Sequence, residues 1–301
     1  MSDSADVLCP IDFSEPSRGA LRYAMAIATH LKAPLTVLTV NDPLLEQAAD
    51  MAGATGSLAA AAKTESDRFL QDTFSNRPPA VKTTYAVASG KPDVEILRIA
   101  RESGARLIVM SSRGATGIRK LFLGSITERV LRATSAPVLV TPPADAGPAA
   151  PADIAKTVRR ILVPVDLSDA MGDAVRAAMA VAEVVGATVL IAHVIEPVRA
   201  MVPGHAYAAN VDMERRARAE QRIQQIADAL PSASRTEPLV LFGDPAEEIA
   251  KLAGERQAGL IVMGLHASAA AGARMGSVTY RVLSVTHGLV LGLPPGAPIT
   301  P

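Results

Sequence analysis

The chain has 301 residues, of which 49% are hydrophobic and 3% aromatic, and it contains no tryptophan. This length suits about two globular domains, and the hydrophobic content excludes a disordered chain. Thirty basic and 30 acidic residues give a formal net charge of zero, so no overall field would hold the protein on nucleic acid or on an anionic membrane.

The cysteine content and the N-terminal segment bear on the compartment. Cys9 is the single cysteine, which excludes an intramolecular disulfide and fits a reducing compartment. Residues 1–6 are polar and acidic and lack the pattern of a signal peptide. The apolar stretch 177–195 is interrupted by Glu183 and divided by Gly186 into a helix and a strand. We therefore expect a cytoplasmic protein without a membrane partner.

The first half of the chain alternates short β-rich segments with longer amphipathic ones. After a strand at 7–11, Ser14 is a candidate N-cap, and Glu15 and Pro16 suit the first turn of a helix. Further segments follow in the same alternation. Strands are predicted at 35–40, 81–87, 107–110 and 138–140, and helices at 57–74, 92–103 and 126–133.

The second half repeats this order. Strands are predicted near 161–165, 188–194, 237–242, 260–263 and 289–292, and helices near 169–185, 211–229, 245–256 and 277–285. The offset between Asp12 and Asp166 is 166 − 12 = 154, and that between Met110 and Met263 is 263 − 110 = 153. Matched landmarks in one order indicate a duplicated domain. We expect domains at 1–142 and 158–294, joined by an extended Ala/Pro-rich linker at 143–157.

The alternation of apolar strands and amphipathic helices sets the fold class. Near-continuous apolar strands separated by helices predict a parallel sheet covered on both faces. The predicted fold is therefore α/β, with two tandem doubly wound domains, each a five-stranded, mostly parallel sheet. Open sheets of this kind bind ligands beyond the carboxyl ends of their strands.

The segment after the fourth strand of the first copy has the chemistry of an anion site. Gly114 and Gly117 permit close backbone approach. The amides of Gly124–Ile126 begin a helix, where unpaired N–H groups and the helix dipole favour an anion. Positive charge comes from three side chains of the same loop, Arg113, Arg119 and Lys120. A phosphate group would fit this combination.

The end of the first strand adds an acceptor, and each feature also has a purely structural interpretation. Asp12 can accept from a ribose hydroxyl or an adenine amine, but it can equally cap the turn after its strand. The alternative role of Ser125 is that of an N-cap alone, and glycine-rich turns are common in doubly wound folds. Residues 43–60 are either a mobile cover over the site or the fraying start of a helix.

Together these segments give the chain its resemblance to a known family. It resembles the universal stress protein family in its tandem form, through the two copies, the Pro-x-Asp-x-Ser start at 10–14 and the Gly-x-Pro at 90–92. The family's ATP-binding pattern is Gly-x2-Gly-x9-Gly-Ser/Thr. The first copy reads Ser111-x2-Gly114-x9-Gly124-Ser125, so a serine replaces the first glycine.

The resemblance implies the adenine-nucleotide α-hydrolase-like form of the fold, and ATP, alone or with magnesium, as the ligand. It implies adenosine contacts from Pro10, Asp12, Val40 and Met110. It implies phosphate contacts from Gly114, Gly124, Ser125 and Ile126, with Ser111 and Arg113 in the same loop.

The second copy departs further from the pattern. It reads Gly264-x2-Ala267-x8-Gly276-Ser277, and its loop is one residue shorter, with 276 − 267 = 9 against 124 − 114 = 10. The candidate contacts that remain are Asp166, Val194, Met263, Gly264, Gly276 and Ser277. We therefore hypothesise that the first copy binds ATP and that the second binds it weakly or not at all.

Two functions of different classes fit this sequence. One is a stress-response regulatory protein whose ATP state alters its conformation or its partners. The other is a nucleotide-independent, stress-linked scaffold that acts through its dimer surface. The histidines are scattered without metal-ligand spacing, and we assign no catalytic or metal-binding residue. At most we expect slow ATP hydrolysis.

Two further expectations concern partners. The closing strands 138–140 and 289–291 are expected to pair between the domains of one chain, because unpaired edges are a liability, and a homodimer remains open. The segment 203–222 contains Arg215, Arg216 and Arg218, but the interleaved Glu214 and Glu220 favour a solvated helix face. We expect no nucleic-acid partner.

Overall fold

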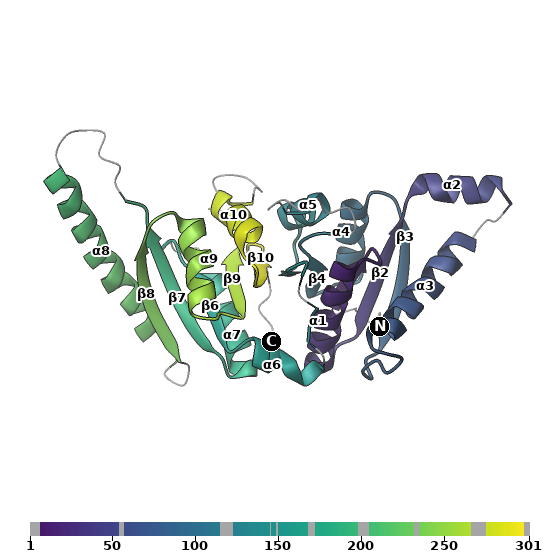
Figure 1. The fold of residues 1–301 in the computed structure, drawn as a ribbon, viewed down its shortest axis with the longest axis horizontal. Helices are drawn as coiled ribbons and strands as arrows, with labels where there is room; N and C mark the ends of the chain where they lie inside the picture. The colour runs from purple at the N-terminus through teal and green to yellow at the C-terminus, as the bar shows by residue number, and fades with distance from the viewer. Residues whose placement is uncertain are drawn as a thin grey trace. The chain divides into compact units, whose positions relative to one another are not determined.

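The structure is a computed structural model that describes residues 7–53, 57–114, 123–144, 146–148, 150–167, 172–197, 205–231, 235–265 and 275–297. The chain divides into two compact units, Met1–Thr157 and Val158–Pro301, called unit 1 and unit 2 below. Among the described residues, each unit has five strands that alternate with helices, and unit 1 has two helices, α2 and α3, where unit 2 has the single helix α8 (Figure 1).

Unit 1 is built on a parallel sheet with the strand order β3-β2-β1-β4-β5. Its strands are β1 Val7–Ile11, β2 Leu35–Asn41, β3 Thr83–Ser89, β4 Leu107–Ser111 and β5 Val138–Thr141. Its main helices are α1 Glu15–Leu31, α2 Pro43–Met51, α3 Ser57–Thr73, α4 Pro92–Glu102 and α5 Ser125–Ala133.

Unit 2 repeats this arrangement with the order β8-β7-β6-β9-β10, again with parallel neighbours. Its strands are β6 Arg160–Pro164, β7 Thr188–Ile195, β8 Thr236–Phe242, β9 Leu260–Gly264 and β10 Leu289–Leu293. Its helices are α7 Gly172–Val185, α8 His205–Asp228, α9 Pro245–Glu255 and α10 Ser277–Val285. The predicted α/β fold with two tandem doubly wound domains is confirmed.

The strand order places the helices on both faces of each sheet. In unit 1 the chain moves outward from β1 through β2 to β3, then returns to β4 on the other side of β1 and continues to β5. Right-handed crossovers in opposite directions put α1 and α3 on one face and α4 and α5 on the other. The contacts agree, since α1 packs on α3 and α4 packs on α5 (Figure 1).

The core of each unit consists of aliphatic side chains from the central strands. Leu8 of β1 and Ile108 of β4 are fully buried in unit 1, and Leu162 of β6 and Ile261 of β9 in unit 2. Each such side chain contributes roughly 1.5–3 kcal/mol through burial. Cys9, the next residue of β1, is also fully buried, and its burial raises the pKa of the thiol.

Local sequence signals set the start of several elements. Ser14 is the N-cap of α1, as predicted, and its hydroxyl accepts from the amide of Ser17. Pro92 and Pro245 lie in the first turns of α4 and α9, two residues after Gly90 and Gly243. Those two glycines have φ values of 147° and 144°, which side-chain-bearing residues rarely adopt. The paired Gly-x-Pro segments therefore have a conformational reason to recur.

The apolar stretch 177–195 divides as the sequence predicted. α7 ends at Val185, Gly186 follows with a φ of 70°, and β7 begins at Thr188. No described helix combines the length and the apolar character that crossing a membrane requires.

The segment expected to be an extended linker contains structure of its own. Residues Pro151–Asp153 form a 3-10 turn and Ile154–Thr157 a short helix, and the 3-10 turn packs on α1. The guanidinium of Arg22 on α1 also donates to the carbonyl of Ala146 at 2.9 Å. The Ala/Pro-rich composition hides these contacts because they depend on a side chain distant in sequence. The domain boundaries 1–142 and 158–294 stay a prediction.

The described part of residues 43–60 contains two helices. Residues 43–51 form the separate helix α2 and α3 begins at Ser57, so they are not the fraying start of the next helix. The mobile cover over the site stays a prediction. The large apolar side chains of α2, Leu44, Leu45 and Met51, are exposed. The third strand begins at Thr83, two residues after its predicted start, because the backbone pairing with β2 begins where Leu35 meets Thr83.

Candidate functional site

The candidate site lies at the carboxyl ends of β1 and β4, which are neighbours in the sheet of unit 1. Their register pairs Val7 with Leu107 and Leu8 with Ile108. The chain leaves β1 toward α1 and leaves β4 toward α5, on opposite faces, so the two following loops diverge around this point. Crevices of this kind are the usual ligand positions of doubly wound sheets.

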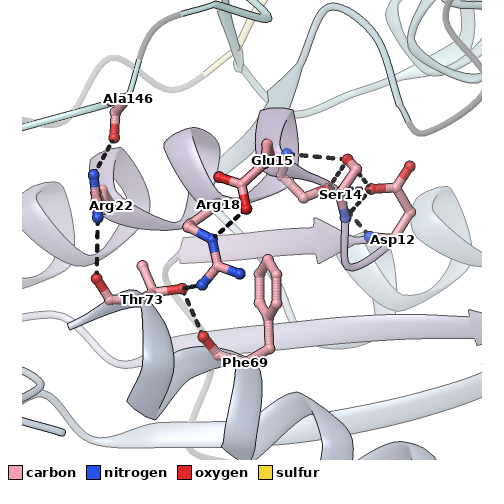
Figure 2. Close-up of polar contacts among 9 residues, drawn as sticks. Asp12, Ser14, Glu15, Arg18, Arg22, Phe69, Thr73 and Ala146 are labelled. Atoms are coloured by element: carbon pink, nitrogen blue, oxygen red, sulfur yellow. Dashed lines mark hydrogen bonds and ion pairs between the residues drawn. The ribbon is translucent and has the colours of Figure 1, made fainter. Parts of the chain in front are cut away.

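Asp12 follows β1, and one of its carboxylate oxygens holds the turn into α1. Oδ1 accepts from the amide of Ser14 at 3.2 Å and from the hydroxyls of Ser14 and Ser17 (Figure 2). Between them Phe13 adopts a left-handed φ of 61°. The structural interpretation of Asp12 as a turn cap therefore holds for Oδ1.

The second carboxylate oxygen of Asp12 faces the loop after β4. A Cβ added to Gly114 would lie 2.3 Å from Oδ2 of Asp12, much closer than two such atoms can approach. Glycine at 114 is therefore required for this approach of the loop to the carboxylate. The structure brings together two predicted site residues that are 102 positions apart, 114 − 12.

The first turn of α5 is fastened to the end of β4. The amide of Gly124 donates to the carbonyl of Ser112 at 2.8 Å, and the hydroxyl of Thr127 donates to the carbonyl of Ser111 at 2.9 Å. Thr127 is buried, so this hydrogen bond is screened from water. Together the two bonds fix the N-terminus of α5 at the carboxyl edge of the sheet.

The interpretation of Ser125 as an N-cap is wrong. Gly124 occupies the N-cap position with extended backbone angles, and Ser125 is the first helical residue, with an exposed side chain. The adjacent Ile126 is also exposed. The first-turn amides of α5, which lack intrahelical acceptors, therefore stand beside an outward-facing hydroxyl.

The remaining predicted contacts of unit 1 differ in how accessible they are. Pro10 and Val40 are half-buried at the ends of β1 and β2, where each presents apolar surface. Met110 is buried in the core. Arg113 is half-buried, and its amide donates to the hydroxyl of Ser111 at 3.4 Å. Gly117, Arg119 and Lys120 lie outside the described residues.

Unit 2 has the same scaffold at the corresponding edge. The amide of Gly276 donates to the carbonyl of Leu265 at 3.0 Å, and the hydroxyl of Thr279 donates to that of Gly264, also at 3.0 Å. Asp166 is exposed, and the following Leu167 has a φ of 62°, nearly the value at Phe13. The positions of Val194, Met263 and Ser277 match those of Val40, Met110 and Ser125.

The serine at position 111 has a simple steric explanation. Gly264 is its counterpart, since 264 − 111 = 153, and a Cβ added there would meet nothing within 4 Å. The fold therefore does not need glycine at this first position of the pattern, whereas a side chain at 114 would displace the Asp12 carboxylate or the loop. The counterpart of Gly114 is Ala267, which lies outside the described residues, as does His266.

Sequence reasoning missed Thr127 and Thr279. Both follow the pattern Gly-Ser-x-Thr, at 124–127 and 276–279, so the signal was present in the repeat itself. Among the described residues, no group of three or more His, Cys, Asp or Glu side chains could hold a metal ion.

The universal stress protein family model matches residues 5–142 and 157–291. The chain belongs to the universal stress protein family. A family member of Methanocaldococcus jannaschii is 31% identical over 137 residues, which cover 44% of this chain and 79% of that protein. A second, of Bacillus subtilis (strain 168), is 29% identical over 142 residues and is covered to 96% of its length, against 44% of this chain.

A solved structure supports the fold along the whole chain. A universal stress protein from Archaeoglobus fulgidus DSM 4304 aligns with a TM-score of 0.66 and 22% identity, covering 96% of each chain. At this identity the likeness concerns the fold alone.

The threonine bond at the base of α5 gives a test of the scaffold. We expect Thr127→Val to lower the free energy of unfolding of unit 1 by about 1–2 kcal/mol, because the carbonyl of Ser111 loses a buried donor. Urea denaturation followed by circular dichroism would measure the change. Thr279→Val is the matched change in unit 2 and should have a similar cost. A Thr127→Val protein as stable as the wild type would show that this bond does not hold the helix.

Proposed function

We propose that this protein is a stress-response regulatory protein that binds ATP, chiefly in unit 1, at the carboxyl ends of β1 and β4. The observation that carries the proposal is the approach of Gly114 to Oδ2 of Asp12. It puts a carboxylate acceptor and a glycine-containing loop at one point, beside the fastened N-terminus of α5. These are the parts that a nucleoside and its phosphates require.

The two ends of the ligand would meet different chemistry. Pro10 and Val40 offer apolar surface for the adenine, and Oδ2 of Asp12 is placed to accept from the ribose or the base. The first-turn amides of α5, the hydroxyl of Ser125 and the guanidinium of Arg113 would hold the phosphates. Magnesium would enter with the ATP, because it prefers phosphate oxygens and water over a full set of protein ligands.

Unit 2 is proposed to bind ATP weakly or not at all. Its scaffold matches that of unit 1, but Ala267 stands at the position of Gly114 and the loop is one residue shorter. At position 114 an added Cβ would lie 2.3 Å from the carboxylate, so an alanine cannot reproduce the same approach. Asp166, Gly264, Gly276 and Ser277 are the residues through which residual binding would occur.

The second candidate function is a scaffold that binds no nucleotide and acts through its dimer surface. The divergence of the loop in unit 2 favours it, since one copy has lost part of the ATP pattern. For either function we propose no catalytic residue, and we propose that any ATP hydrolysis is slow.

The first experiment distinguishes these two functions directly. The protein is denatured as purified, and any released nucleotide is identified by chromatography and compared with the protein concentration. We expect about one adenine nucleotide per chain, or one per chain after incubation with ATP and magnesium. The absence of nucleotide in both conditions would overturn the ATP proposal and leave the scaffold.

A charge substitution at the start of α5 tests the phosphate end. We expect Ser125→Asp to weaken ATP binding by at least about tenfold, because a carboxylate would face the phosphates. The same change should not destabilise the fold, because an acidic side chain is favourable at a helix N-terminus. Ser125→Asn is the uncharged control of equal size and should bind within about threefold of the wild type. Calorimetric titration with ATP would measure both, and equal affinities for the two variants would contradict this placement of the phosphates.

A steric substitution tests the contact between the two loops. We expect Gly114→Ala to weaken ATP binding in unit 1 by at least about tenfold, or roughly 1.4 kcal/mol, since the added Cβ must displace Asp12 or the loop. Ser111→Gly restores the family pattern and should leave the affinity within about twofold. Wild-type affinity in Gly114→Ala would show that the approach to Asp12 does not serve ATP binding.

A further inference from the structure

Three arginines of α8 in unit 2 face one pocket. Arg215, Arg218 and Arg222 follow the spacing i, i+3, i+7, which places them on one side of a helix, and all three line a cavity of about 300 Å³. Arg216 does not line it, but pairs with Glu220 at 2.7 Å and lies over the ring of Phe242. The predicted solvated helix face is confirmed by the exposed ion pairs Arg218–Glu214 and Arg216–Glu220, and Arg215 is half-buried.

The other walls of the pocket combine apolar surface with one histidine. Leu167, Ile195 and Ala219 are the apolar lining residues. The ring of His193 is held by a hydrogen bond of 2.8 Å between its Nδ1 and the carbonyl of Val165. Because a carbonyl can only accept, Nδ1 carries the proton, and Nε2 is the second polar atom of this pocket-lining ring.

The positive charge of the pocket is only partly neutralised. Arg215 is held by Asp212 at 3.0 Å and by the carbonyl of Glu196 at 2.8 Å. Arg218 has one ion pair, a 3.3 Å contact with Glu214 in which both side chains are exposed, and such pairs are weak. In the described part of the chain, Arg222 has no ion-pair or hydrogen-bond partner.

Unit 1 has no such pocket lining at the equivalent positions. The counterparts of the three arginines are Ala62, Glu65 and Phe69, with offsets 215 − 62, 218 − 65 and 222 − 69 of 153 each. In unit 1 the ring of Phe69 packs edge-on against Phe13 at 5.7 Å between centroids. The guanidinium of Arg18 lies over the ring of Phe69 (Figure 2).

His193 also stands at a position where unit 1 has a hydrogen bond between two side chains. Thr39 is the counterpart of His193, since 193 − 39 = 154, and its hydroxyl bonds that of Ser66 on α3 at 2.9 Å. In unit 2 the counterpart of Ser66 is Ala219, with 219 − 66 = 153. Several equivalent positions thus differ together between the units. Unit 1 has an aromatic ring and hydroxyl groups there, and unit 2 has arginines that line a pocket.

We propose that this pocket of unit 2 binds a compact phosphate-bearing anion, either inorganic pyrophosphate or a small phosphate monoester. Guanidinium groups recognise phosphate through paired N–H donors, and three arginines line this pocket together with a histidine. The volume is at the lower limit of small-molecule sites, about 300 Å³, which suits a ligand smaller than a nucleotide.

The pocket is distinct from the candidate nucleotide site. Successive side chains of a strand point to opposite faces of the sheet. His193 and Ile195 therefore face α8, whereas Val194 faces the side of the candidate adenine contacts. The pocket and the candidate nucleotide contact Val194 therefore lie on opposite faces of the sheet of unit 2.

Calorimetric titration of the full chain with pyrophosphate, and separately with glycerol 3-phosphate, tests the proposal. We expect at least one of the two anions to bind. The anion that binds more tightly shows whether the pocket prefers pyrophosphate or a phosphate monoester. Arg222→Phe, which introduces the side chain of unit 1, and Arg218→Gln should each weaken it at least tenfold. Arg216→Gln removes the same charge from another side of the same helix and should change the affinity less than twofold.

Two controls separate the pocket from other causes. ATP affinity should be unchanged in Arg222→Phe, and circular dichroism should show an intact fold; should that variant misfold, Arg222→Gln replaces it. Absence of binding of both anions to the wild type would overturn the proposal. So would an equal loss in Arg216→Gln and Arg222→Phe, because that result indicates diffuse charge rather than a pocket.

Discussion

The adjacency of β1 and β4, which the chain leaves in opposite directions, is the constraint on which the rest of unit 1 depends. It divides the helices between the two faces of the sheet and leaves the loops after both strands open at one edge. Asp12 then serves two roles because its two oxygens face different partners. Oδ1 holds the turn into α1, and Oδ2 meets the loop that contains Gly114.

The helix N-terminus at this edge is positioned by backbone chemistry that both units share. A glycine amide and a threonine hydroxyl each donate to a carbonyl at the end of β4 or β9. Neither contact involves the side chains proposed to touch ATP. The scaffold can therefore persist while the loop it carries changes, which is how unit 2 retains the fold with an altered loop.

Duplication has let the two units diverge on different faces. Unit 1 keeps the glycine at 114 and fills its α3 face with Phe13 and Phe69. Unit 2 has an alanine in the corresponding loop but places arginines along α8. The net charge of zero for the whole chain does not reveal this difference. The arginines concerned lie on one side of α8, and they differ in how strongly they are ion-paired.

Much of the fold was accessible from the sequence because its signals are local or repeated. Hydrophobic periodicity placed β1 at Val7–Ile11 and α10 at Ser277–Val285, and the constant offset of 153–154 residues revealed the duplication. Composition was a poorer guide at residues 151–157, where short helices replace an expected extended linker. The role of Ser125 was also misjudged, since the N-cap depends on backbone angles that a serine at that position does not reveal.

The sequence by itself determined the fold class, the two copies, the family resemblance and the residues of the glycine pattern. Only the tertiary structure decided at which of those glycines a side chain would meet a neighbour, because the answer at Gly114 depends on a carboxylate oxygen 102 residues away, and at Gly264 on the absence of any atom within 4 Å. It likewise separated Arg222 from Arg216, since the direction of each side chain becomes meaningful only once α8 packs on the sheet.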